Sequence, residues 1–93
     1  MKIDSLFAAV KSDHSEMTLF FLDRGDDPNI QDSEGSTALM YATEKGNRNI
    51  VELLLKRGAD INIKAADGRT ALVIASQRGH KIIEELLKDA GAK

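Results

Sequence analysis

The sequence predicts an all-α fold, a solenoid of three stacked helix–turn–helix repeats with projecting turns and hairpin-like connectors. Segments 32–60 and 65–93 are identical at 12 of 29 positions when they are aligned without a gap. The first third of the chain carries the same 33-residue frame more faintly, so no residues are left for a second domain. A fixed period of this length is typical of stacked repeat proteins. We therefore expect one domain over 1–93, with an N-terminal capping repeat (1–31), an internal repeat (32–64) and a C-terminal capping repeat (65–93).

The first half of the internal repeat predicts a turn followed by a short helix. Gly35 ends a polar turn, and glycine tolerates the positive φ that such turns require. Thr37 offers a hydroxyl group that can cap a helix, and Gly46 is a typical helix end. We therefore expect a helix between Thr37 and Gly46.

The second half of the internal repeat predicts a helix over 48–57 and an extended connector over 59–64. Apolar residues form a broad face along this helix, and we expect Leu53 to be part of the core. Its replacement by alanine is predicted to unfold the array. Two short helices cannot bury such a face alone, so stacking against neighbouring repeats must do so.

The two ends of the chain have the features of caps. Glu84 and Lys88 replace the apolar Val51 and Leu55 where a fourth repeat would pack, and a terminal repeat needs such a polar outer face. The sequence therefore predicts a finished array. Leu19 stands where later repeats have glutamate, and two interpretations stay open: an isolated exposed leucine, or the edge of a self-association patch.

Composition excludes several classes of protein. Lysine and arginine number 13 against 15 acids, which argues against a general nucleic-acid or membrane-surface binder. No cysteine is present, so disulfides and thiolate metal sites are excluded. No signal peptide and no apolar run of membrane-spanning length is recognised, and we expect a cytoplasmic protein.

The repeats resemble the ankyrin family along the whole chain. The family's opening Thr-Pro-Leu-His-x-Ala is similar to 37–42 and 70–75, and its closing Gly-Ala-Asp-x-Asn matches 58–62. Alanine replaces the proline in both clear repeats, and Met40 and Val73 replace the histidine. That histidine ties neighbouring loops together in the family, so the resemblance implies loops that are less firmly held here.

The resemblance also implies a partner-binding surface made of turn tips and the first helix of each repeat. Met40 and Tyr41 could extend this surface, or could pack between repeats as we expect of Val73 and Ile74. The predicted partner-binding residues are Ser33, Glu34, Ser36, Met40, Tyr41, Glu44, Lys45, Asp67, Arg69, Gln77 and Arg78.

No catalytic or metal-binding motif is recognised. His14 and His80 lie two periods apart, in the turn between the helices of their repeats, where a structural polar contact is expected. The basic residues are interleaved with acids and form no single stripe for nucleic acid. We expect a non-catalytic protein–protein interaction module without cofactors or metals, monomeric but with weak self-association left open. The alternatives are an engineered or minimal scaffold without a partner, and an inhibitor or regulatory subunit of an enzyme.

Overall fold

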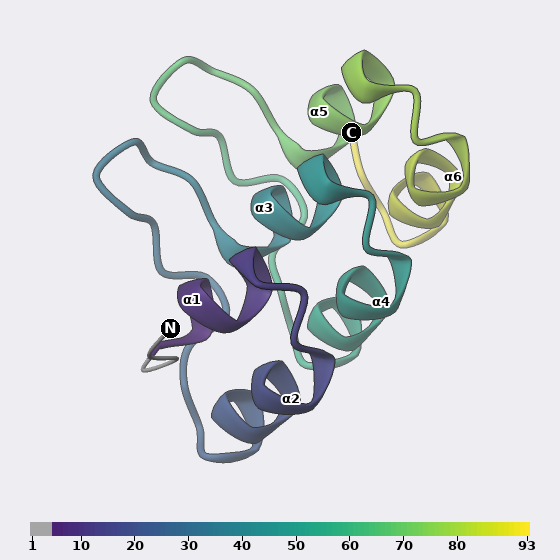
Figure 1. The fold of residues 1–93 in the computed structure, drawn as a ribbon. Helices are drawn as coiled ribbons and strands as arrows, with labels where there is room; N and C mark the ends of the chain where they lie inside the picture. The colour runs from purple at the N-terminus through teal and green to yellow at the C-terminus, as the bar shows by residue number, and fades with distance from the viewer. Residues whose placement is uncertain (1–4) are drawn as a thin grey trace.

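The computed structural model describes residues 5–93, which form six helices and no strand. The helices are paired in sequence order as three helix–turn–helix repeats, which confirms the predicted fold class (Figure 1). Their bounds are α1 Leu6–Lys11, α2 Ser15–Asp23, α3 Ala38–Lys45, α4 Arg48–Lys56, α5 Ala71–Arg78 and α6 Lys81–Asp89.

Local residues set the ends of these helices as predicted. The Thr37 hydroxyl accepts a hydrogen bond of 3.3 Å from the Met40 amide at the start of α3, and Thr70 does the same for α5. Gly46 ends α3 with a φ of 72°, in the left-handed region that glycine adopts without strain. The sequence frame therefore places the helices correctly, and α4 ends one residue before the predicted boundary.

The helices form two layers. Helices α1, α3 and α5 make an inner layer beside the two projecting hairpins, and α2, α4 and α6 make an outer layer (Figure 1). Helix α3 contacts α1 and α5, while α4 contacts α2 and α6. The internal repeat is therefore packed on both sides, as a solenoid requires.

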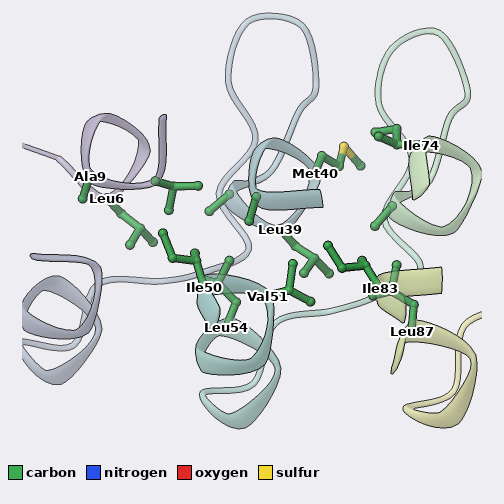
Figure 2. Close-up of a cluster of buried hydrophobic side chains, with 14 of the residues drawn as sticks. Leu6, Ala9, Leu39, Met40, Ile50, Val51, Leu54, Ile74, Ile83 and Leu87 are labelled. Carbon is green, nitrogen blue, oxygen red and sulfur yellow. The ribbon is translucent and has the colours of Figure 1, made fainter. Parts of the chain in front are cut away.

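The core runs continuously through the three repeats and is most enclosed around α4 (Figure 2). Ile50, Val51 and Leu54 are all 0% exposed. The prediction that Leu53 belongs to the core is wrong, because Leu53 is only half-buried. With 3.6 residues per turn, the direction of Leu54 falls between those of Ile50 and Val51, whereas Leu53 lies on the flank of the helix.

The projecting hairpins are linked to each other. The Ala66 amide donates a 2.9 Å hydrogen bond to the Glu34 carbonyl oxygen. The Gln31 side-chain amide donates to the carbonyl oxygens of Gly35 (2.8 Å) and Lys64 (3.0 Å). These contacts link the two loops although the histidine of the family motif is absent.

The two histidines differ in their surroundings. His80 Nε2 lies 3.2 Å from the Glu44 carbonyl oxygen, and its ring packs against Gly46 at the end of α3. His80 therefore makes a structural polar contact between the second and third repeats, as expected. His14, at the equivalent position of the first repeat, is exposed.

The two ends of the stack are not alike. Lys88 forms an ion pair of 3.6 Å with Glu84 on α6. On α2, however, the exposed apolar residue is Phe20, with 54% of its surface accessible, while Leu19 is half-buried. The prediction of an exposed Leu19 is therefore wrong by one position along α2.

Candidate functional site

The predicted partner-binding residues lie on the two hairpins and on helices α3 and α5. At the hairpin tips, Ser33, Glu34 and Asp67 are exposed, while Ser36 and Arg69 are half-buried. On the helices, the exposed residues are Lys45, Gln77 and Arg78, and Glu44 is half-buried. We call this set, together with Tyr41, the inner surface.

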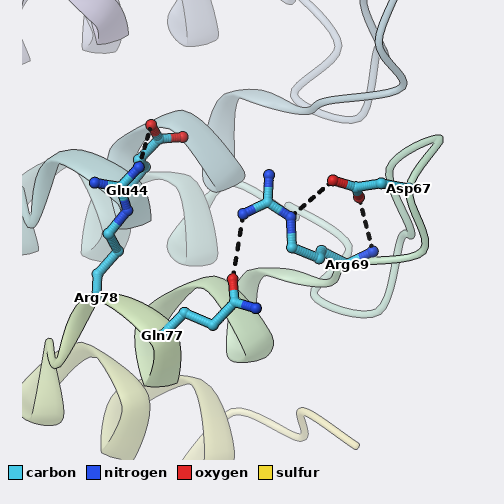
Figure 3. A network of polar contacts seen from close by, with 5 residues as sticks. All are labelled: Glu44, Asp67, Arg69, Gln77 and Arg78. Carbon is cyan, nitrogen blue, oxygen red and sulfur yellow. Dashed lines mark hydrogen bonds and ion pairs between the residues drawn. The ribbon is translucent and has the colours of Figure 1, made fainter.

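Arg69 connects the tip of the second hairpin to α5 (Figure 3). Its Nε donates to Asp67 Oδ2 at 2.8 Å, and its Nη1 donates to Gln77 Oε1 at 3.2 Å. The Arg69 backbone amide also donates to Asp67, and this bond, followed by that of the side chain, lowers the pKa of the Asp67 carboxyl. The guanidinium group is thus held in one place by partners from both the hairpin and the helix.

Ion pairs cross the junctions between repeats on the same surface. Arg78 Nη2 lies 3.0 Å from Glu44 Oε1, joining α5 to α3 (Figure 3). Lys45 Nζ lies 3.6 Å from Asp13 Oδ2, joining α3 to the turn after α1. Exposed pairs contribute about 0–1 kcal/mol each, so their main effect is to orient charged groups rather than to hold the fold.

Tyr41 lies at the junction of the first two repeats. Its hydroxyl donates to Asp32 Oδ2, its ring meets Phe7 edge-on at 5.9 Å between centroids, and Lys11 Nζ lies 4.5 Å from the ring centroid. The hydrogen bond with Asp32 raises the pKa of the Tyr41 phenol and lowers that of the Asp32 carboxyl. The Tyr41 side chain therefore packs against Phe7 and Lys11 and remains partly accessible to solvent.

Met40 does not belong to the inner surface. It is 3% exposed and packs between α3 and α5, as the alternative interpretation held (Figure 2). Val73 occupies the same position in the next repeat and was expected to pack likewise, but it is 40% exposed. The difference arises because, among residues 5–93, α5 has a neighbouring inner helix on one side only, and none of the described helices covers Val73.

Four neighbours of the inner surface were missed from the sequence: Phe7, Lys11, Asp13 and Asp32. The 33-residue repeat did not indicate these residues, because the two residues in each contact occupy different positions of the repeat. The charged residues at and just after the end of α1, Lys11 and Asp13, would have been a usable hint, because they lie beside the next repeat.

No group of side chains that could form a metal-binding centre is found in residues 5–93, since no three histidine, aspartate or glutamate side chains are placed there to hold a metal ion. None of the six described helices has both the length and the apolar character needed to cross a bilayer. The inner surface is thus a set of polar and charged groups with one aromatic residue.

Comparison with protein families matches residues 6–93 to the family described as ankyrin repeats (3 copies). The chain belongs to the ankyrin repeat family. Ankyrin repeats are in general protein–protein interaction modules and typically non-catalytic. A putative ankyrin repeat protein of Acanthamoeba polyphaga mimivirus is 48% identical over 40 residues, which cover 43% of this ankyrin chain and 10% of the viral protein. The matched segment is thus a small part of that relative.

Proposed function

We propose that this ankyrin protein is a non-catalytic module that binds a partner protein through the inner surface. The observation that supports the proposal best is the link between the two hairpins and the helices below them. Gln31 joins the hairpins, and Arg69 joins the second hairpin to α5. A surface that is already ordered loses little conformational entropy when it binds, so more of the contact energy appears as affinity.

The charges on the inner surface favour a partner with mixed charge. Glu34 and Asp67 stand at the hairpin tips, and Lys45 and Arg78 stand on the helices. A partner that places basic groups at the tips and acidic groups over the helices would complement them. Charge complementarity of this kind gives specificity and fast association.

Affinity capture from native lysate of the source organism tests the proposal. The test variant is Glu34→Lys with Lys45→Glu, which reverses two accessible charges on the inner surface and keeps the net charge. The matched control is Lys56→Glu with Glu85→Lys, which makes the same exchange on the outer helices, where both residues are exposed.

We expect a protein that is retained by the wild type and by the control but lost from the test variant. Capture of the same proteins by all three chains would refute the assignment to the inner surface. An empty capture with all chains folded would refute a binding function and favour a scaffold without a partner.

A further inference from the structure

One exposed apolar side chain is not explained by the stacking of the repeats. Ile82 is 58% exposed on α6, and the other two repeats have the polar Glu16 and Asn49 at the equivalent position. Asn49 is exposed although α4 packs against α2 on one side and α6 on the other. This position of the repeat therefore faces solvent even where another repeat follows, so further stacking would not cover Ile82.

Ile82 lines a hollow between the second and third repeats. The hollow has a volume of about 430 Å³ and lies where the turn from α3 to α4 approaches the turn from α5 to α6 (Figure 1). It is lined by Arg48, His80, Lys81, Ile82, Ile83 and the two glycines that end α3 and α5. We call it the turn hollow. Because the His80 ring is held against the end of α3, one wall of the turn hollow is already ordered.

The charged side chains that line the turn hollow are both basic. Arg48 Nε lies 3.0 Å from Glu52 Oε1, which leaves the two terminal nitrogens of Arg48 without a partner among residues 5–93. Lys81 is exposed and forms no ion pair within that range. The acids on these helices, Glu52 and Glu85, stand one turn further along α4 and α6, so neither lines the hollow. The turn hollow therefore combines apolar side chains with hydrogen-bond donors for carboxylates.

Basic residues continue along both turns beyond the hollow. Segments 45–49 and 78–82 contain four lysines or arginines and no acid, whereas the equivalent segment 12–16 of the first repeat contains two acids and neither lysine nor arginine. Lys45 and Arg78, just before the two glycines, are oriented by ion pairs with Asp13 and Glu44. An extended peptide can place carboxylates along such an edge, and a small molecule is too short to do so.

We propose that the turn hollow docks an acidic peptide segment of a partner protein. One aliphatic side chain of the segment lies against Ile82 and His80, and its carboxylates lie against Arg48 and Lys81. Burial of the aliphatic side chain supplies affinity, while the charges fix the register and speed association. The turn hollow borders the inner surface but shares no residue with it, so this is a second site beyond the proposed function.

Titration of the isotopically labelled protein with a synthetic peptide tests the proposal. The probe is a short peptide with a central leucine, glutamates on both sides of it and blocked ends. Proton–nitrogen correlation NMR spectra report the location of binding and the Kd together. We expect a Kd of about 0.1–1 mM that rises with salt concentration, and amide shifts concentrated in 46–49 and 79–83.

Two variants with matched controls test the two parts of the site. Ile82→Asn, which restores the residue of the internal repeat, should raise the Kd by about tenfold. Phe20→Asn is its control, since Phe20 is also exposed but lies on α2. Lys81→Glu should raise the Kd by about fivefold or more, and Lys56→Glu, at the far end of α4, should leave it unchanged. Circular dichroism confirms that each variant is folded.

Several results would overturn the proposal. They are the absence of amide shifts at millimolar peptide, shifts outside the two turns, and equal binding by Ile82→Asn and the wild type. Equal binding of a peptide with serine in place of leucine would show that charge alone is responsible. Equal binding of free isocaproate would show that a small carboxylate, and not a peptide, is the occupant. None of these results involves the hairpin tips, so the proposed function is tested separately.

Discussion

Leu54→Ala should remove most of the stability of the stack. Leu54 is 0% exposed on α4, the helix that packs against both α2 and α6. Leucine-to-alanine changes in a core cost about 2–5 kcal/mol, and the cost is greatest where the surroundings cannot collapse into the cavity. Because α4 is held on both sides, we expect a loss in the upper half of that range, against a total of about 5–15 kcal/mol for a small domain.

The neighbouring leucine provides a matched control with the same chemistry. Leu53 is half-buried, so Leu53→Ala should cost only about 1–2 kcal/mol. Urea denaturation followed by far-UV circular dichroism gives both values from the shift of the midpoint at constant slope. Equal losses for the two variants, or a larger loss for Leu53→Ala, would refute the packing of α4 described above.

Three further predictions concern polar groups of the inner layer and the hairpins. Tyr41→Phe should reduce stability near neutral pH, and the difference from the wild type should shrink above pH 10.0 and below pH 3.8. The hydrogen bond between the neutral Tyr41 phenol and the Asp32 carboxylate raises the pKa of the phenol and lowers the pKa of the carboxyl. Its contribution to stability is therefore lost when the phenol ionises at high pH or the carboxylate is protonated at low pH. Denaturation at several pH values would show a constant difference between the variant and the wild type if the pair were unimportant. Gln31→Ala removes one hydrogen bond within the first hairpin and one to Lys64 of the second hairpin, and should cost about 0.5–1.5 kcal/mol, with faster amide exchange in the second hairpin as the readout. Thr43→Val should stabilise the protein by about 1 kcal/mol and raise Tm by about 4–8 °C. The Thr43 hydroxyl is buried without a hydrogen-bond partner among residues 5–93, and Val10 already occupies the equivalent position in the first repeat. An unchanged or lower Tm would contradict this reasoning.

The helices could be predicted from sequence because local residues set their ends. Thr37 caps α3 through its own hydroxyl group, and Gly46 ends the helix through its own backbone freedom. Both effects act within one turn and need no knowledge of the neighbours. The repeat frame then copies the same assignment to α5.

The details of packing could not be predicted in this way, because they depend on what lies across each junction. Met40 and Val73 share one frame position, yet one is buried and the other 40% exposed, since only Met40 has a helix on its far side. Tyr41 is held by Asp32, a residue nine positions earlier whose carboxylate points back from the hairpin. Periodicity identifies equivalent positions, but it does not show which of them have a neighbour.

The contact of His80 with the preceding repeat gives the chain a built-in spectroscopic reporter. The imidazole lies against Gly46 and the Glu44 carbonyl oxygen, while His14 at the equivalent place is exposed. In a proton NMR spectrum the two ring signals are therefore an internal pair, one sensing the junction and one serving as the solvent-facing reference. If the last repeat frays before the remainder of the stack melts, the His80 signal alone will move first on heating, and the order of unfolding can be followed without any label.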